Sequence, residues 1–376
     1  MRAAVKRALV VCGTRPEGIK LAPVIAALRA RSDVFETKLC VTGQHKELLD
    51  PILKFFGLTP DFDLALMKPG QTLYDVNANA LLKLKPVMDA FKPHVVIVQG
   101  DTTTALAGAL AGFYEKVKVA HVEAGLRTHL KYSPFPEEMN RVLITRLTDF
   151  HFAPTEVARG MLTAEKVTEG VHVTGNTVTD ALLEARTLVD AKFADTFARE
   201  FSFLDSSRRL VLVTGHRRES FGEPFENICR AIRTLAERHS DVEFVYPVHL
   251  NPNVRAPVDK ILKGAPRVHL IEPVDYPRLV WLLARSFFVL TDSGGIQEEA
   301  PTLGKPVLVM REVTERPEGI TAGCAELVGT DERRIIDAAQ RLLTDSAAWK
   351  RMAQAQNPYG DGQASARIVK VLEAGV

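Results

Sequence analysis

The amino-acid sequence predicts an α/β protein of two doubly wound, Rossmann-like domains that face each other across a cleft. Two observations carry this prediction. Short apolar runs rich in β-branched residues alternate with stretches of helical periodicity, which is the pattern of parallel strands joined by crossover helices. The alternation starts again after residues 180–203, a polar helical stretch without a strand of its own. We therefore expect an N-terminal domain at 1–175, a C-terminal domain at 176–362 and a final helix at 363–376 that packs back on the first domain.

Length and composition are those of a globular enzyme with two hydrophobic cores. The 376 residues are 46% hydrophobic and 25% charged, and a formal net charge of +2 gives no reason to expect nucleic acid or a membrane as a partner. The basic and then apolar start of the chain is interrupted at residues 14–17, too early for a signal peptide. No transmembrane stretch is apparent in the sequence, so we expect a cytoplasmic protein. The four cysteines are scattered without a CxxC pair, which argues against a metal site or a disulfide framework.

The centre of the first domain is expected at two buried strands, residues 95–98 and 117–120, joined by a helix of small and apolar residues. Asp101 follows the first strand and Glu123 follows the second, at the edge where open α/β sheets bind their ligands. Residues 102–104, all threonines, offer a helix cap and free backbone donors at the start of the helix. Asp101 alone could equally be a cap or a partner of the helix dipole, but a second acid at the neighbouring strand end favours a site.

The remaining elements of the first half follow in order. We expect strands at 8–12, 35–42, 150–152 and 171–174, helices at 19–29, 46–56, 72–91 and 155–163, and a loop at 61–70. The turn at 13–18 enters the first helix with a glycine, so its backbone N–H groups could cradle an anion. Arg15 and Lys20 would add positive charge to this cradle, although its spacing fits neither a P-loop nor GxGxxG. Later, Glu137 and Glu138 fall at a helix start, where they could complement the helix dipole or act in catalysis.

The second half contains a candidate anion site at Ser293, Gly294 and Gly295. Its strands are expected at 210–213, 242–247, 268–271 and 287–290, and its helices at 224–238, 254–262 and 276–284. The serine and glycines follow the last of these strands and start a helix, so they offer backbone donors without a Cβ in the way. Glu298 and Glu299, one turn later, would repel a phosphate but could accept hydrogen bonds from ribose hydroxyls. Either could instead be only a dipole partner.

Positive side chains gather at another strand end of the second half. His216, Arg217 and Arg218 follow the strand at 210–213. Arg316, in a later loop, is a further candidate, with a solvated salt bridge as its alternative. Together the two halves offer clustered carboxylates and a site for a nucleoside diphosphate. This combination predicts an enzyme that acts on a nucleotide sugar.

The motifs themselves resemble one family. In chain order they are GTRPEGIKLAPVI, TGQH, GDTTTALA, HVEAGLRT, SPFPEEMNR, TGNTVTDAL, TGHRRESFG, YPVHLNPNV, DSGGIQEEAPTLGKPVLVMR, TERPE and NPYGDGQAS. They are similar to those of the non-hydrolysing UDP-N-acetylglucosamine 2-epimerases of bacteria. The resemblance implies a GT-B fold, a homodimer, no metal and no nicotinamide or other cofactor. It also implies interconversion of UDP-GlcNAc and UDP-ManNAc for surface polysaccharide synthesis.

The resemblance assigns roles residue by residue. Elimination of UDP to 2-acetamidoglucal and its re-addition would use Asp101, Glu123 and Glu137 as catalytic acids, without a decision on which acts on which face. His216 matches a position that meets UDP and takes part in catalysis. The other positions that match UDP contacts are Arg15, Lys20, Ser293, Gly294, Gly295, Glu299 and Arg316. A second, activating UDP-GlcNAc would be met by Gln44, His45, Glu138, Arg217 and His249.

Three other functions stay open at this point. A hydrolysing epimerase would release ManNAc and UDP, and the GQH, PEE and HRRE motifs argue against it. A GT-B glycosyltransferase would use the same nucleotide cradle, but three acids near one sugar exceed what it needs. A non-catalytic nucleotide-sugar sensor would not need those acids at all.

Overall fold

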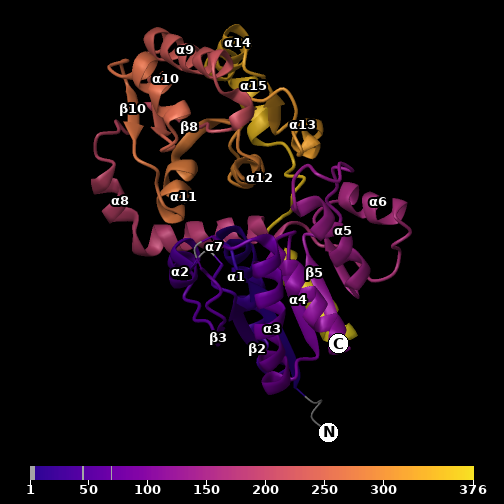
Figure 1. The fold of residues 1–376 in the computed structure, drawn as a ribbon. Coiled ribbons are helices and arrows are strands. Elements are labelled where there is room, and N and C mark those ends of the chain that lie inside the picture. Colours follow the sequence, from indigo (N-terminus) through magenta and orange to yellow (C-terminus); the bar gives the residue numbers. More distant parts are fainter. Residues whose placement is uncertain (1–4, 45, 69) are drawn as a thin grey trace. The chain divides into compact units, whose positions relative to one another are not determined.

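The structure is a computed structural model that describes residues 5–44, 46–68 and 70–376. The chain divides into two compact units, one of residues 1–181 with 360–376 and one of residues 182–359. The end of the chain therefore belongs to the first unit, where Figure 1 marks the C-terminus. The last helix of the chain packs against the first helix. In the part of the chain that is described, no helix has the length and apolar character needed to cross a membrane.

The first unit is built on a seven-stranded sheet in the order β3-β2-β1-β4-β5-β6-β7, in which every neighbouring pair is parallel. Its strands are β1 (Lys6–Cys12), β2 (Phe35–Val41), β3 (Phe62–Asp63), β4 (Val95–Gln99), β5 (Lys118–Val122), β6 (Phe150–Ala153) and β7 (Val171–Val173). The expectation of a plain loop at 61–70 is wrong at β3. This edge strand has only two residues, which is too short for a period-2 pattern to reveal.

Helices cover both faces of this sheet. They are α1 (Arg15–Ala30), α2 (Lys46–Phe55), α3 (Leu73–Phe91), α4 (Thr103–Tyr114), α5 (Glu137–Leu147), α6 (Glu156–Ala164) and α16 (Ala364–Gly375). Alternate residues of β1 point to opposite cores: Val10 packs in the core formed with α1 and α16, and Leu9 in the core formed with α3 and α4. Helix α1 begins at Arg15 and not near residue 19 as predicted. Pro16 is accommodated there because the first helical turn has no need of its N–H.

The second unit repeats the plan with a six-stranded parallel sheet in the order β10-β9-β8-β11-β12-β13. Its strands are β8 (Arg209–Thr214), β9 (Val242–Pro247), β10 (Val268–Ile271), β11 (Ser286–Thr291), β12 (Val307–Val309) and β13 (Ala325–Leu327). The α-helices after the first unit's α6 are α7 (Thr177–Lys192), α8 (Ala194–Glu200), α9 (Glu223–Arg238), α10 (Pro252–Leu262), α11 (Tyr276–Arg285), α12 (Gly294–Thr302), α13 (Pro317–Ala322), α14 (Glu332–Thr344) and α15 (Ser346–Ala353). A short 3-10 turn, η1 (Arg218–Ser220), follows β8. The predicted helical stretch at 180–203 is thus two helices, and α7 runs from the first unit into the second.

Each sheet reverses its strand order once, and this reversal positions the candidate sites. In the first sheet the reversal lies between β1 and β4, and in the second between β8 and β11. The loops that leave two such strands diverge, which opens a crevice at their carboxyl ends. Both sheets are therefore doubly wound, as the alternation of runs in the sequence predicts.

Candidate functional site

Asp101 lies in the turn that leaves β4, directly after Gly100, whose φ of +70° suits a residue without a Cβ. Its carboxylate accepts a hydrogen bond from Arg141 Nη2 at 2.5 Å, and its backbone carbonyl accepts one from Asn140 Nδ2 at 2.8 Å. The cap of α4 is Thr102, the first of the three predicted threonines, and its hydroxyl accepts a hydrogen bond from Ala105 N at 3.0 Å. Asp101 is therefore not the helix cap, and its side chain turns to other partners.

The three predicted acids influence one another through their charges. Burial raises the pKa of Asp101 above its usual range, and the nearby Arg141 guanidinium opposes this. The negative charges of Glu123 and Glu137 raise the pKa of Asp101 further, which shows that all three carboxylates lie close enough to interact. A carboxyl group whose pKa is raised toward neutrality is suited to give and take protons.

Glu123 leaves β5 in a left-handed conformation, with φ of +66°, and its side chain is 5% exposed. Lys20 Nζ donates to its two carboxylate oxygens at 2.7 and 2.6 Å. The side-chain amides of Gln99 and Asn176 donate to the same carboxylate, Asn176 at 3.3 Å. The ammonium and the two amides stabilise the negative form of Glu123. Sequence reasoning places Lys20 only at the phosphates and misses both amides, although Asn176 stands in the TGN motif.

His121 is a third residue to which sequence reasoning assigns no role. It lies on β5 two residues before Glu123, is fully buried, and contacts the carbonyl oxygen of Gly100 through Nε2 at 2.7 Å. Burial lowers its pKa to about 3, so the ring stays neutral and Nε2–H is the donor to this carbonyl. The contact ties the turn that carries Asp101 to the strand that carries Glu123. A lone histidine inside an apolar run gives no sequence signal for such a role.

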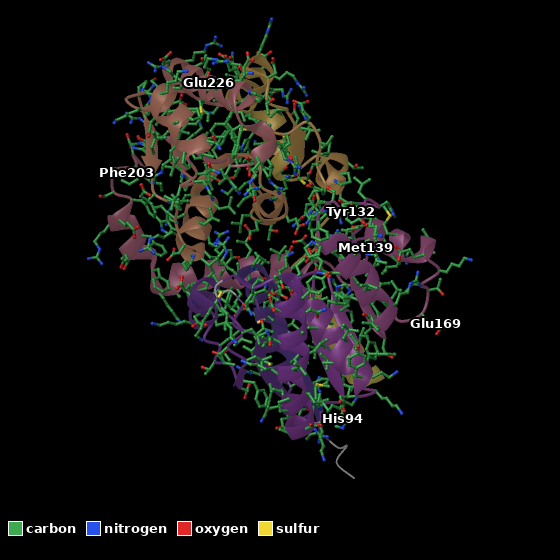
Figure 2. The ribbon with its side chains drawn as sticks, viewed as in Figure 1. His94, Tyr132, Met139, Glu169, Phe203 and Glu226 are labelled. Atoms are coloured by element: carbon green, nitrogen blue, oxygen red, sulfur yellow. The ribbon has the colours of Figure 1, made fainter. Side chains whose placement is uncertain are left out.

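Glu137 and Glu138 have different surroundings at the start of α5. Glu137 is half-buried and contributes its charge to the acid cluster. Glu138 is 3% exposed, and its carboxylate accepts from the backbone N–H groups of Thr128, at 3.1 Å, and His129, at 2.9 Å. It also lies 3.5 Å from Arg141 Nη1. Glu138 thus holds the loop before α5; Figure 2 labels Tyr132 within this loop and Met139 on α5.

The predicted anion cradle at the first turn requires a correction. The backbone N–H groups of Gly13 and Thr14 donate to Glu17 Oε2, at 3.0 and 2.8 Å. The Thr102 hydroxyl donates to the other oxygen of Glu17 at 2.7 Å. Two donors of the turn are therefore already used by a buried carboxylate of the same chain. Arg15 is exposed at the start of α1 and is the cationic side chain of this turn that faces solvent.

Gln44 lies at the same carboxyl edge of the first sheet, in the turn after β2. The hydroxyl of Thr104, in the first turn of α4, donates to its Oε1 at 3.0 Å and also lies 3.0 Å from the hydroxyl of Thr42. A Cβ on Gly13 would come within 2.2 Å of the Thr42 hydroxyl. Glycine is therefore required at position 13, where the turns that follow β1, β2 and β4 meet. His45, the neighbour of Gln44, lies outside the described residues.

The candidate phosphate site of the second unit begins where β11 ends. The N–H of Ser293 donates to Thr291 Oγ1 at 2.9 Å, so this donor is used within the protein. Gly294 and Gly295 are partly or fully exposed at the start of α12. A Cβ on Gly294 would lie 3.8 Å from Arg217 Nη2, and one on Gly295 would lie 4.0 Å from the Ser293 hydroxyl. The turn thus presents an accessible backbone beside a guanidinium, which suits an anion.

His216 and His249 lie together at the neighbouring strand ends. Their rings stack with centroids 5.2 Å apart and 12° between planes. Partial burial lowers the pKa of His216, the carboxylate of Asp292 opposes this, and the neighbouring His249 ring and Arg217 guanidinium lower the pKa further. The structure therefore brings the predicted His216, Arg217, His249 and Gly294 into one region of the second unit.

Arg316 and the two acids of α12 form the rest of this region. Arg316 donates through Nε to Glu298, which is 2% exposed, so the salt bridge considered for this arginine is present. Glu299 is 8% exposed, and its negative charge adds to burial in raising the pKa of Tyr276. The Arg316 carbonyl accepts from the Tyr359 hydroxyl at 3.3 Å, and that hydroxyl also accepts from Gly319 N at 3.0 Å.

The fold and these sites define a two-domain α/β protein with a Rossmann-like sheet in each domain and a polar site at each switch point. Among the residues that the structure describes, no three or more His, Cys, Asp and Glu side chains are grouped to hold a metal ion. A family model described as UDP-N-acetylglucosamine 2-epimerase matches residues 26–373. The chain belongs to this family.

Individual relatives match over almost the whole chain. A UDP-N-acetylglucosamine 2-epimerase of Escherichia coli (strain K12) is 53% identical over 370 residues, which cover 98% of each protein. One of Campylobacter jejuni is 47% identical over 378 residues, covering 99% of this chain and 98% of the relative.

Solved structures give the same result. The UDP-GlcNAc 2-epimerase of Neisseria meningitidis, bound to UDP-GlcNAc, has a TM-score of 0.88 at 45% identity, over 98% of this chain and 100% of that one. The enzyme of Methanocaldococcus jannaschii in complex with UDP-GlcNAc and UDP has a TM-score of 0.77 at 33% identity, over 99% and 100%. The predicted GT-B-like α/β fold with two Rossmann-like domains is thereby confirmed.

Proposed function

We propose that this protein is a non-hydrolysing epimerase that interconverts UDP-GlcNAc and UDP-ManNAc at C2 of the sugar. The observation that carries the proposal is the cluster of Asp101, Glu123 and Glu137 at the switch point of the first sheet. Membership of the UDP-N-acetylglucosamine 2-epimerase family supplies the substrate. The acid cluster supplies the means to move a carbon-bound proton.

The chemistry requires more than a base. The C2 proton of UDP-GlcNAc is not beside a carbonyl, so its removal needs the C1–O bond to UDP to break first or at the same time. The positive character that develops at C1 then acidifies C2–H, and elimination gives 2-acetamidoglucal and UDP. Protonation of C2 on the opposite face and return of UDP to C1 yield the epimer. Carboxylates that exchange protons and stabilise the cation can perform these steps.

The surroundings of the acids suit a division of labour. The carboxylate of Glu123 accepts hydrogen bonds from Lys20 and from two side-chain amides, so it is placed to stabilise positive character at C1. Asp101 has a raised pKa and remains 28% exposed, which suits a group that exchanges a proton with the sugar. Glu137 is half-buried beside Asp101 and is the third proton-transfer candidate.

The second domain is proposed to bind the UDP portion. Gly294 and Gly295 at the start of α12 offer backbone donors to the diphosphate, and His216 adds a titratable donor. Glu299 is assigned to the ribose hydroxyls, and Arg316 to the nucleotide. The remaining predicted UDP contacts are Arg15, Lys20 and Ser293. Support comes from the relatives, because the Neisseria meningitidis structure holds UDP-GlcNAc and a Staphylococcus aureus structure holds UDP.

Clamping of the glucal intermediate is part of the proposal. If 2-acetamidoglucal or UDP escaped, water could complete the reaction and the enzyme would act as a hydrolase. We propose that the protein works as a homodimer in the cytoplasm and that its product feeds surface polysaccharide synthesis. Exposed apolar side chains on α3 and α4, Leu82 and Phe113 among them, are consistent with a partner surface.

A second UDP-GlcNAc is proposed to activate the enzyme through Gln44, Arg217 and His249, with His45 outside the described residues. Glu138 belongs to the same predicted set, but its buried carboxylate already binds two backbone N–H groups, so its contribution would be to shape the loop. Replacement of Gln44 or His249 by alanine should leave UDP binding intact and reduce activation by UDP-GlcNAc. An unchanged dependence of rate on UDP-GlcNAc in both variants would remove the second site.

Proton NMR of the purified protein with UDP-GlcNAc in D₂O, with a chelator and no added cofactor, tests the main proposal. We expect UDP-ManNAc with deuterium at C2, because the proton returned to C2 comes from solvent-exchanged groups. Free ManNAc and UDP would identify a hydrolysing epimerase instead. Binding of UDP without any turnover would favour a glycosyltransferase or a sensor.

A further inference from the structure

Asp292 is a buried carboxylate that the motifs leave without a role of its own. It directly follows β11 and is 1% exposed. Its Oδ2 accepts hydrogen bonds from the backbone N–H groups of His216, at 2.6 Å, and Arg217, at 2.7 Å. Its other oxygen, Oδ1, is buried without a hydrogen-bond partner in the described part of the chain. Such an oxygen is costly to leave unsatisfied, so a donor is expected to reach it when the protein works.

The imidazole of His216 is placed to be that donor. Its Nδ1 lies 3.8 Å from Asp292 Oδ1, just beyond hydrogen-bonding distance. The ring is 45% exposed, so it can turn by a small amount. On its other side it stacks on His249, whose own Nδ1 accepts a hydrogen bond from the N–H of Asn251 at 3.1 Å. Because Nδ1 of His249 accepts this hydrogen bond, it carries no proton that could be donated to Asp292 Oδ1.

We propose that Asp292 is a positioning residue for His216. When nucleotide binds, Asp292 Oδ1 accepts a hydrogen bond from Nδ1–H of His216. This hydrogen bond fixes the tautomer of the ring and directs its Nε2 away from Asp292, toward the diphosphate. A carboxylate behind an imidazole holds the ring in one orientation and stabilises its protonated form. The protonated ring then stabilises the negative charge that grows on the diphosphate as the C1–O bond breaks. Only this last step rests on the proposed epimerase function.

The same carboxylate also fixes the loop that carries the histidine. Because Oδ2 binds the two backbone N–H groups at 216 and 217, the end of β11 sets the path of the chain after β8. The phosphate-binding turn follows Asp292 directly, so one residue links the imidazole to the glycines of α12. The structure thus assigns to Asp292 the alignment of the loop that carries His216 with the glycine turn at the start of α12.

The groups that face His216 predict how its protonation will respond. Asp292 favours the protonated ring, whereas burial, His249 and Arg217 oppose it. Substitution D292N removes the favourable charge, so the pKa of His216 should fall. The measurement is long-range ¹H–¹⁵N NMR of the full chain with ¹⁵N-labelled histidine, with and without UDP, as a function of pH. The H216Q variant assigns the resonances.

We expect the Nδ1–H tautomer for His216 in the UDP complex of the wild-type protein, and loss of both this tautomer preference and the higher pKa in D292N. The kcat for UDP-GlcNAc should fall, and the alkaline limb of the pH profile should move to lower pH, because His216 then loses its proton at a lower pH. The matched control is T291V, which removes a buried hydroxyl that lies 2.6 Å from Thr214 Oγ1 in the same junction. It should lower stability and leave the pKa of His216 unchanged.

An Nε2–H tautomer of His216 in the wild-type UDP complex would overturn the proposal, and this result does not depend on whether D292N folds. The proposal is equally overturned if wild type and D292N share one His216 pKa, or if T291V shifts that pKa as much as D292N does. If NMR shows the pairing but the wild-type protein converts no UDP-GlcNAc, Asp292 still positions His216 and it is the proposed function that fails.

Discussion

Substitution K20M should expose the cost of the buried charge on Glu123. Lys20 Nζ contacts both carboxylate oxygens within 2.7 Å, and the two side chains are only 17% and 5% exposed. Removing one partner of a buried ion pair typically costs about 3–5 kcal/mol, because the remaining charge is left without compensation. Gln99 and Asn176 still donate to the carboxylate in the variant, so we expect the low end, about 3 kcal/mol. For a domain of roughly 150–250 residues this corresponds to a fall of about 6–12 °C in Tm.

Placement of the tryptophans makes the assay selective. The chain has two, Trp281 and Trp349, and both belong to the second unit. Calorimetry and far-ultraviolet circular dichroism report on both units, whereas tryptophan fluorescence reports on the second alone. K20M should therefore lower a calorimetric transition without an equal shift in the fluorescence transition.

The double variant K20M/E123Q is the decisive control. If the loss arises from an uncompensated charge, the neutral amide of E123Q should restore most of the stability that K20M removes, because no charge is then left buried. The reasoning is refuted if K20M loses less than about 1 kcal/mol, or if the double variant is less stable than the sum of the two single changes predicts.

Three further variants test the same domains. D101N should reduce kcat by about 10²–10⁴, as expected for loss of a proton-transfer group, and a rate near that of wild type would remove Asp101 from the mechanism. The pKa of Asp101 is raised on folding, so ionisation of Asp101 opposes folding as pH rises through that pKa. At pH 8 the free energy of unfolding of D101N in urea should therefore equal or exceed that of wild type. A marked loss of stability in D101N would contradict this sign. G13A should cost about 1–3 kcal/mol, because its Cβ would lie 2.2 Å from Thr42 Oγ1; T42A/G13A should recover part of this in thermal unfolding. Y359F should cost about 1–3 kcal/mol, because it leaves the buried Gly319 N–H without its acceptor, and the fluorescence transition of the second unit should report it.

Much of the fold can be predicted because strands buried on both faces appear as short β-branched runs. The runs at 95–98 and 287–290 fall within β4 and β11, and Asp101 stands where a carboxyl-edge residue should. The two-residue strand β3 escapes such reasoning, since its pairing with β2 depends on the path of a loop. The predicted start of α1 is late, because Gly18 suggests a turn where Arg15 and Pro16 already form the first helical turn.

The sites can be predicted less completely than the fold. Strand ends locate the acids, but the partners of Glu123 come from positions 20, 99 and 176, which no local pattern connects. Glu17 illustrates the opposite error: the glycine turn has the composition of an anion site, yet its donors bind the carboxylate of its own helix. Composition indicates that donors are present, and only the direction of side chains shows what occupies them.

The return of α16 to the first domain has a consequence for synthesis of the protein. Ile368 and Leu372 are fully buried in the same core as β1 and α1, and Arg31 binds the carboxylate of Glu373 at 2.7 Å. A ribosome therefore delivers the first residues of this core at the beginning of translation and the last residues only at its end. The inserted second domain, residues 182–359, can complete its core before the final helix of the first domain has been synthesised. Truncation of α16 should thus impair the domain that was synthesised first.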